Sequence, residues 1–176
     1  MSSNRSAPEH WLEELPEPEA LSPGEFDAWR GLIRLRETVM REIDRRLRHD
    51  GLISLADYGI LITLVTAPGL RLRMSDLGAQ RMLTPSGITR VVVRLEEQGL
   101  VSREPDPADG RAAFAALTQS GLEALRLAQV VHHATVRELY TGRLTRHELV
   151  RLAALFEKAL PGVVSASAWP PPQPSA

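Results

Sequence analysis

The chain has 176 residues, of which 43% are hydrophobic and 24% are charged, as in an ordinary soluble globular protein. It contains no cysteine, which excludes disulfide bonds, thiol catalysis and thiolate metal sites. No apolar run approaches the roughly 18 residues of a membrane-spanning helix, and the N-terminus lacks the basic start and apolar segment of a signal peptide, so a cytoplasmic location is expected.

The formal net charge of -1 hides an asymmetry along the chain. Residues 1–28 hold one basic and seven acidic residues, so the remaining 20 basic and 15 acidic residues give residues 29–176 a net charge of +5. Between Leu70 and Leu95, five arginines are accompanied by a single acid, Asp76. A concentrated basic segment is typical of a surface that binds a polyanion such as DNA.

The N-terminal part of the chain predicts an arm followed by two helices. Residues 1–21 are acidic and interrupted by prolines, so they are expected to form a flexible arm. A long helix is predicted from Ser22, which forms a capping box with Glu25, to about Arg48. Its apolar side is marked by Trp29, Leu32, Ile33, Val39, Ile43 and Leu47. Ser54 is predicted to cap a second helix, which ends before a Pro-Gly pair.

The next two helices form a predicted helix-turn-helix. A short helix begins near Ser75, and after a brief turn Thr84 caps a basic helix that has proline at its first position. The apolar stripe of this basic helix consists of Ile88, Val91, Val92 and Leu95. The opposite face carries Ser86, Thr89, Arg90 and Arg94. This pattern predicts a DNA-recognition helix, although an ordinary surface helix with solvated arginines fits the same stretch taken alone.

A two-stranded hairpin is predicted to follow the basic helix. Leu100–Arg103 forms one strand, Pro105–Arg111 holds the turn, and Ala112–Leu117 forms the return strand. A hairpin after a helix-turn-helix is the wing of a winged helix. Thr118 is predicted to cap a further long helix that runs to about Tyr140.

The C-terminal part holds one more helix and a tail. Thr145 opens the helix with a second capping box, and the proline-rich segment 161–176 is predicted to be disordered. The helices outside the winged unit carry more apolar surface than that unit can cover, so we expect them to pair with another chain. No nucleophile–base pair, phosphate-binding loop or metal-ligand spacing is present, and adjacent His132 and His133 make a poor chelate. No catalytic residue, metal site, cofactor or enzyme activity is therefore expected.

The order of these motifs resembles the MarR family of bacterial transcriptional regulators over about residues 25–160. The resemblance is carried by Ser86-Gly87-Ile88-Thr89-Arg90, Arg94-Leu95-Glu96, Gly99-Leu100-Val101 and Asp109-Gly110-Arg111-Ala112. It implies one MarR-type domain at 22–160, mainly α with a small β-hairpin wing. The winged helix-turn-helix would span about 54–117, with dimerisation helices at 22–50 and 118–160. It also implies an obligate homodimer on a pseudo-palindromic operator, acting as a repressor that small aromatic ligands release from DNA.

Candidate DNA contacts follow from the basic helix and the wing. Arginine can chelate guanine O6 and N7 or bind phosphate, so Arg90 and Arg94 are expected to contact DNA. Ser86 and Thr89 lie near the helix N-terminus, where hydroxyls either bind DNA or serve as local caps. Arg111 is expected to enter the minor groove, with Asp109 and Gly110 shaping the tip, unless the tip is a solvated turn. Further phosphate contacts are expected from Arg71, Arg73 and Arg81.

Three points are left open by the sequence. The resemblance places His132 near the dimerisation helices, where it is a candidate lining of a ligand pocket with Trp29 and Tyr58; core packing is the alternative. Val93 stands where many family members have an acidic residue, and it either contacts a thymine methyl group or is a tolerated apolar surface residue. The alternative function is a winged-helix protein-interaction module that does not bind an operator.

Overall fold

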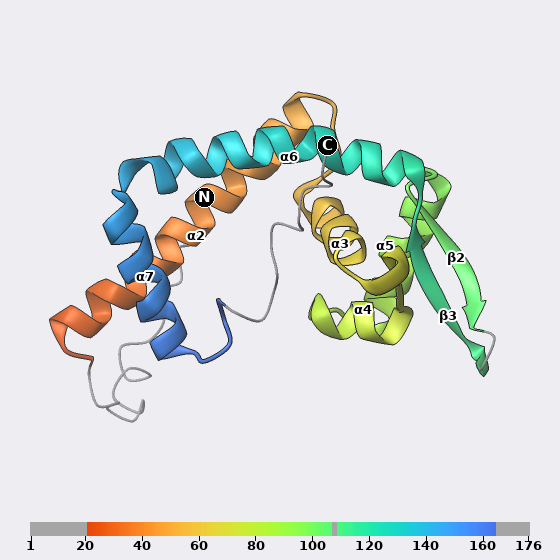
Figure 1. The fold of residues 1–176 in the computed structure, drawn as a ribbon, viewed down its shortest axis with the longest axis horizontal. Helices are drawn as coiled ribbons and strands as arrows, with labels where there is room; N and C mark the ends of the chain where they lie inside the picture. The colour runs from red at the N-terminus through yellow and green to blue at the C-terminus, as the bar shows by residue number, and fades with distance from the viewer. Residues whose placement is uncertain (1–20, 107–108, 165–176) are drawn as a thin grey trace, which may run out of the picture. The chain divides into compact units, whose positions relative to one another are not determined.

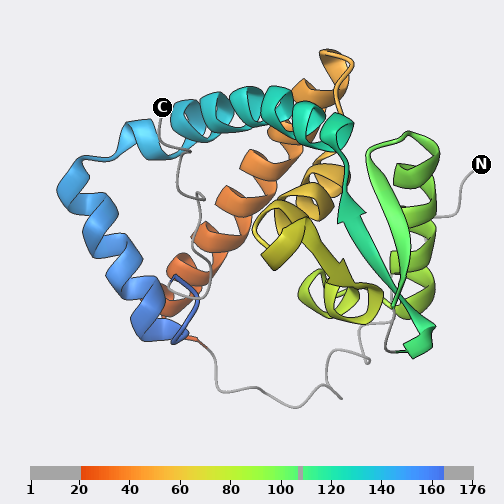
Figure 2. The same ribbon diagram turned by 45° about the vertical axis from the view of Figure 1, so that its right-hand side comes forward.

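The computed structural model describes residues 21–106 and 109–164. These residues form α-helices of seven to 27 residues and one small antiparallel sheet (Figures 1 and 2). The described chain is mainly α-helical, which confirms the predicted fold class. It divides into two compact units after Arg36, within helix α2 (Pro23–His49). Nearly all of the predicted arm and tail lie outside the described residues.

The first unit contains the N-terminal part of α2. The predicted capping box is present, because the Ser22 backbone N–H donates to the Glu25 carboxylate at 2.8 Å and the Glu25 N–H donates to the Ser22 hydroxyl at 3.4 Å. Most of the apolar side chains of this part remain exposed to solvent, among them Phe26, Trp29, Leu32 and Leu35, and Ile33 is half-buried. The sequence periodicity therefore gives a helix here, but its apolar stripe is not covered within the described chain.

The core of the second unit is built around α3 (Leu55–Val65). Ser54 caps this helix by accepting a hydrogen bond from the Asp57 N–H at 3.1 Å, as the sequence predicted. The C-terminal part of α2 packs its apolar side into the same core. The buried residues that α2 and α3 contribute are Val39, Ile43, Leu47, Tyr58, Ile60, Leu61 and Leu64. Because α3 is buried over most of its circumference, it acts as the central element against which the others are placed.

The predicted helix-turn-helix consists of α4 (Met74–Gln80) and α5 (Pro85–Glu97). In the turn, the Leu83 N–H donates to the Gly78 carbonyl at 2.9 Å. Met82 has φ of 52° and is 93% exposed, so a large apolar side chain projects from the turn in a left-handed conformation that non-glycine residues seldom adopt. The turn thus exposes the start of α5 to solvent.

The sheet has three strands in the order β1-β3-β2, all antiparallel. The wing is formed by β2 (Val101–Asp106) and β3 (Asp109–Leu117), and both strands extend further than the sequence predicted. Pro105 does not stop β2, because β2 is an edge strand with a register irregularity next to this proline. The short strand β1 (Arg71–Arg73) was not predicted; it pairs Leu72 with Ala115.

Two helices complete the second unit. Thr118 caps α6 (Gln119–Leu139), and Thr145 with Glu148 forms the predicted capping box of α7 (Arg146–Ala159). Single turns of 3-10 helix, η1 (Pro68–Leu70) and η2 (Thr141–Arg143), lie before β1 and after α6. At the start of the predicted tail, the Gly162 and Val164 N–H groups donate to the Glu157 carboxylate at 2.7 and 2.9 Å.

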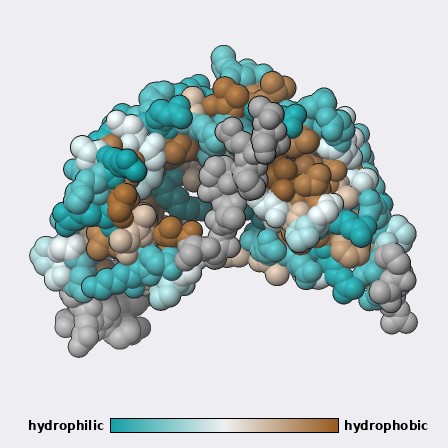
Figure 3. Space-filling model, in the orientation of Figure 1, coloured by the Kyte–Doolittle hydropathy of each residue, from teal (hydrophilic) through white to brown (hydrophobic). Residues whose placement is uncertain are grey.

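Large apolar side chains also remain exposed on α6 and α7. The most exposed are Leu127, Val130, Val150 and Leu155. Figure 3 shows apolar atoms, coloured brown, among the hydrophilic atoms on one face of the molecule. Within the described part of the chain, no helix is both long and apolar enough to traverse a lipid bilayer. These side chains are therefore uncovered surface on helices that, in the case of α6, also contribute to the core.

Gly121, in the first turn of α6, allows this helix to approach closely the short segment that connects α5 to β2. A Cβ atom added at this position would lie 2.0 Å from the Leu100 carbonyl oxygen, which accepts a hydrogen bond from the Thr118 N–H at 3.3 Å. Gly121→Ala should therefore lower the free energy of unfolding by about 1–3 kcal/mol, the usual cost of overpacking.

The measurement is urea unfolding followed by circular dichroism, with Gly31→Ala in α2 as the matched control. No atom of another described element lies within 4 Å of a Cβ atom added at Gly31. Alanine should there be neutral or stabilising by about 0.5–1 kcal/mol, since glycine weakens a helix interior. Equal effects of the two substitutions would contradict the proposed close contact at Gly121.

Candidate nucleic-acid interface

The candidate interface begins with the exposed face of α5. Thr84 caps the helix by accepting a hydrogen bond from the Gly87 N–H at 3.1 Å, and proline occupies the first helical position. The apolar face is buried through Ile88, Val92 and Leu95. Val91 and Val93 are half-buried at the edges of that face, so Val93 is less exposed than the helical periodicity suggested. The helix is thus fixed from behind and presents its polar side to solvent.

The predicted contact residues at the start of α5 are exposed. The Thr89 hydroxyl donates to the Pro85 carbonyl at 2.8 Å, and the Ser86 and Thr84 hydroxyls lie 3.3 Å apart. These local hydrogen bonds leave acceptor positions on the hydroxyls free for a donor outside the helix. Arg90 is exposed and has no ion-pair or hydrogen-bond partner among the residues that the structure describes. Its guanidinium group can therefore bind an external acceptor without breaking an internal contact.

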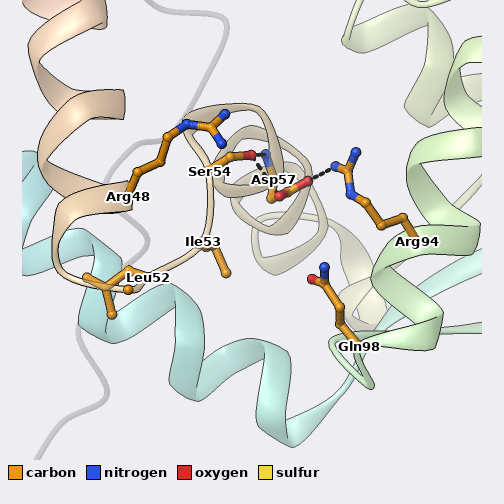
Figure 4. A pocket seen from close by; sticks show the side chains of 8 residues that line it. Arg48, Leu52, Ile53, Ser54, Asp57, Arg94 and Gln98 are labelled. Atoms are coloured by element: carbon orange, nitrogen blue, oxygen red, sulfur yellow. Dashed lines mark hydrogen bonds and ion pairs between the residues drawn. The ribbon is translucent and has the colours of Figure 1, made fainter.

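Arg94 lies one turn further along α5 and differs from Arg90. Its guanidinium group forms an ion pair with Asp57, in the first turn of α3 (Figure 4). The Asp57 carboxylate is buried, and its second oxygen accepts a hydrogen bond from the Ser54 hydroxyl at 2.7 Å. Arg94 is 47% exposed, so it reaches both this buried acid and solvent. The sequence predicted a DNA contact for Arg94, and its internal partner was not foreseen.

The wing and strand β1 carry the other predicted basic residues. Arg71 pairs with Glu104 at 2.9 Å, and Arg73 pairs with the buried Asp106 at 2.6 Å. Both guanidinium groups also lie over the Phe114 ring, at 4.9 and 5.9 Å from its centroid. Arg73 thus connects the start of α4 to the wing through its ion pair. Its side chain is still 45% exposed.

The wing tip is described only in part. Asp109 is exposed at the start of β3. Gly110 and Arg111 belong to β3 by their backbone, and their side-chain positions lie outside the described residues. The expected minor-groove contact of Arg111 therefore stays a prediction from the sequence.

A groove of about 400 Å³ lies between the start of α4, the exposed face of α5 and the wing. It is lined by Arg73, Met74, Ser75, Thr89, Arg103, Ala112 and Ala113. The two guanidinium groups on its walls are donors of the kind that commonly bind DNA phosphates, whereas the Ser75 and Thr89 hydroxyls donate to Asp76 and to the Pro85 carbonyl. Arg103, which pairs with Glu96 at 2.6 Å, was missed in the sequence, although its alternation on the outward face of β2 could have revealed it.

A second polar feature lies in the core of the same unit. The rings of Tyr58 and His132 are stacked, with centroids 4.7 Å apart and planes inclined by 12°. The Tyr58 hydroxyl and His132 Nδ1 are buried and have no hydrogen-bond partner in the described ranges. Burial raises the pKa of Tyr58 to about 12. The structure therefore brings together two of the three predicted pocket residues; Trp29 belongs to the first unit and is 57% exposed.

Comparison with known proteins gives consistent matches. The model of the MarR family matches residues 53–112. The uncharacterised HTH-type transcriptional regulator YkoM of Bacillus subtilis is 31% identical over 87 residues, which are 49% of this chain and 56% of that protein. The HTH-type transcriptional repressor IacR of Pseudomonas putida is 31% identical over 84 residues, 48% of this chain and 50% of that protein. This chain thus spans about half the length of these two relatives.

A solved structure extends the similarity over most of the chain. The MarR family transcriptional regulator Sco3205 of Streptomyces coelicolor, in complex with DNA, superposes with a TM-score of 0.74 at 34% sequence identity. The superposition covers 83% of this chain and 91% of that structure. The match therefore includes the helices on both sides of the winged unit as well as the unit itself.

The buried position of His132 makes a prediction for stability. Burial, with a smaller effect of His133, lowers the pKa of His132 below its ordinary value of 6.5. Between these two pKa values the unfolded chain binds a proton that the folded chain does not, so the stabilising effect is complete above pH 6.5 and is lost as pH falls below it. The melting temperature of the wild type should fall more between about pH 7 and pH 5 than that of His132→Phe, which keeps the ring stack without titrating.

Calorimetric melting over this pH range measures the difference, and His147→Gln, at an exposed position on α7, is the control. The His147 variant should follow the wild type. If His132→Phe also follows it, His132 does not contribute to the pH dependence of folding.

Proposed function

Since this chain belongs to the MarR family of transcriptional regulators, we propose that it binds a pseudo-palindromic operator as a homodimer and acts as a ligand-responsive repressor. The observation that carries the DNA-binding part is the exposed Arg90 on the recognition helix, which has no ion-pair partner among the described residues and lies on the helix that borders the groove with Arg73 and Arg103. A helix of this kind enters the major groove with its N-terminal residues on the base edges. The DNA complex of the similar Sco3205 supports this arrangement.

The proposed contacts divide into two kinds. Arg90 would read base edges, because arginine presents two parallel donors to guanine O6 and N7. Arg73 and Arg103 would bind phosphates in the groove beside it, and the Ser75 and Thr89 hydroxyls border the same groove. Ser86, at the helix start, would contact the DNA backbone. Arg111, at the wing tip, would contact the minor groove. Phosphate contacts position the protein, and the helix provides the sequence specificity.

Homodimer formation is supported by exposed apolar side chains on the helices that flank the winged unit. Trp29 on α2, Leu127 on α6 and Leu155 on α7 are each more than half exposed. Monomeric soluble proteins seldom leave large contiguous apolar surfaces in water, so a second copy of the chain is the proposed cover. A dimer would also place two recognition helices on the two half-sites of a palindrome.

Ligand response is proposed for the region of Tyr58 and His132. Their two buried polar atoms lack partners within the described ranges, and a small aromatic ligand that carries a hydroxyl group would hydrogen-bond with them. Both residues lie where α3 meets α6, so a ligand there would favour one placement of the DNA-binding helices over another. The name of IacR, a repressor, supports repression as the output.

A second candidate function is a winged-helix protein-interaction module. It is favoured by the pairing of Arg71, Arg73 and Arg103 with carboxylates, which lowers the net positive charge of the surface. The two functions differ in their dependence on salt. DNA affinity would fall steeply with salt concentration because counterions are released on binding, and a protein-interaction module would show no DNA affinity.

The first test of DNA binding concerns Arg90. A duplex selected by the wild-type protein from a random-sequence pool serves as the probe. Arg90→Ala should weaken binding to this duplex by about 1–3 kcal/mol, because alanine cannot make the bidentate bond to a base. A gel-shift titration measures the change. Arg41→Ala on α2, which also removes an exposed arginine, should bind like the wild type; wild-type affinity of both variants would exclude α5 as the reading element.

The second test concerns the homodimer. Sedimentation equilibrium should give twice the chain mass of 19.4 kDa. Leu155→Glu should shift the protein toward the monomer, since the change places a charge in the proposed interface. Arg146→Glu, on the opposite side of the same helix, should leave the mass unchanged. A monomeric wild type would rule the homodimer out.

A further inference from the structure

We infer that Asp57 is a positioning residue for DNA recognition, which holds the recognition helix in its reading orientation through the ion pair with Arg94. The inference rests on the proposed binding of DNA and adds to it a group that would not touch DNA. It also gives Arg94 an internal role in place of the DNA contact that its position on the helix suggested.

Asp57 lies in a buried and fully paired environment. This residue is 6% exposed, in the first turn of α3. One carboxylate oxygen is bound by Arg94 and the other accepts from the Ser54 hydroxyl, which in turn accepts from the Asp57 N–H. A buried carboxylate is costly unless it is paired and hydrogen-bonded. Within the described residues, Arg94 is the cation that forms an ion pair with this carboxylate, so moving it away to a phosphate would leave Asp57 with only the longer-range attraction of Arg48.

The ion pair also constrains the orientation of α5 about its axis. The apolar face of α5 packs through Ile88, Val92 and Leu95, and such packing is largely independent of direction. The ion pair differs, because the planar guanidinium group must meet the carboxylate in a defined geometry. It therefore restricts the rotation of α5 about its own axis. Arg90 lies one turn from Arg94, so any rotation that broke the pair would also redirect Arg90.

Asp57 is itself held in place by contacts between the start of α3 and α2. The first backbone N–H of α3, at Leu55, donates to the Asp44 carboxylate of α2 at 2.9 Å, and Arg48 holds the other oxygen of Asp44 at 2.7 Å. The start of α3 is thus anchored to α2 on one side and to α5 on the other. A movement of this part of α2 relative to α3 would reach α5 through these polar contacts, which links the orientation of the recognition helix to the flanking helix.

The pair is accessible from one side. A cleft of about 520 Å³ opens beside it, lined by Arg48, Gly51, Leu52, Ile53, Ser54, Asp57, Arg94 and Gln98 (Figure 4). Arg94 is therefore free on its outer edge, and a direct DNA contact is the competing role. The two roles predict opposite effects of removing Asp57. If Arg94 acts by contact, removal of its internal partner frees it for DNA; if it acts through Asp57, the same removal impairs recognition.

The experiment compares Asp57→Asn, Arg94→Gln and the double variant. Asparagine keeps the shape of Asp57 and can accept from Ser54, so the fold is retained while the charge is removed. The probes are a duplex selected by the wild type from a random pool and a scrambled duplex of equal length. Each single variant should bind the selected duplex about tenfold more weakly, and the double variant no more weakly than the singles. Affinity for the scrambled duplex and the slope of affinity against salt should stay unchanged.

Arg45→Gln is the matched control, because it removes an exposed arginine paired with Glu42 on α2 and should leave both affinities unchanged. The inference is overturned if Asp57→Asn binds the selected duplex as tightly as the wild type. It is also overturned if Arg94→Gln reduces the salt slope by about 0.9, the change expected for a side chain that neutralises one phosphate. A wild type that binds no DNA instead overturns the proposed function itself.

Discussion

The N-terminus of α3 is the polar junction on which the arrangement of the DNA-binding unit depends. This helix is buried over most of its length, so the unsatisfied N–H groups of its first turn need fixed partners rather than water. Asp44 of α2 supplies one acceptor, and Ser54 supplies another. The carboxylate of Asp57 then recruits Arg94 from α5. Polar contacts at this point thus connect α2, α3 and α5, and the apolar core fills the space behind them.

Close contacts through glycine complete this arrangement. Gly59 on α3 leaves room for the Arg81 guanidinium group at the end of α4, and Gly78 on α4 lets Ile88 of α5 approach. Gly121 does the same for α6 against the Leu100 carbonyl group. A side chain at Gly121 would collide with backbone, one at Gly78 would need a small shift of Ile88, and one at Gly59 would displace the exposed Arg81 side chain. The contact at Gly121 therefore sets the spacing of α6 against the segment that follows α5, and recognition by a rigid helix requires such support.

The features that the sequence predicted well are those set by neighbouring residues. The caps at Thr84, Thr118 and Thr145 each involve an N–H three residues on, and the apolar stripe of α5 follows from its spacing. Strand β1 was missed because three residues show no period and its partner, β3, follows two helices and a strand later. The alanines of β3 have poor strand propensity, but burial of Ala115 and Ala116 in the central strand overrides it.

The same limit applies to the candidate site. Arg90 and Arg94 are about 40° apart on a helical wheel, so periodicity gives them the same exposure and the same expected role. What separates them is Asp57, which approaches only Arg94 and lies far away in the sequence. Likewise, no local pattern shows that Asp106 would be buried against Arg73. The recognition helix could thus be predicted from its basic face together with the short helix before it and the hairpin after it, whereas the division of its arginines between internal and external roles depends on tertiary contacts.

This division changes how the basic segment should be understood. Counted along the sequence, the arginines between Leu70 and Leu95 form a strongly positive stretch, but three of them are paired with carboxylates in the fold: Arg71, Arg73 and Arg94. A DNA phosphate approaching Arg71 or Arg73 would meet Glu104 or Asp106 as well, which weakens attraction that depends on charge alone. Non-specific affinity would therefore be small relative to the contribution of base contacts by Arg90. A surface whose cations are largely balanced by carboxylates raises the ratio of specific to non-specific affinity. For a regulator that must find one site among many, this ratio matters more than the affinity for the site itself.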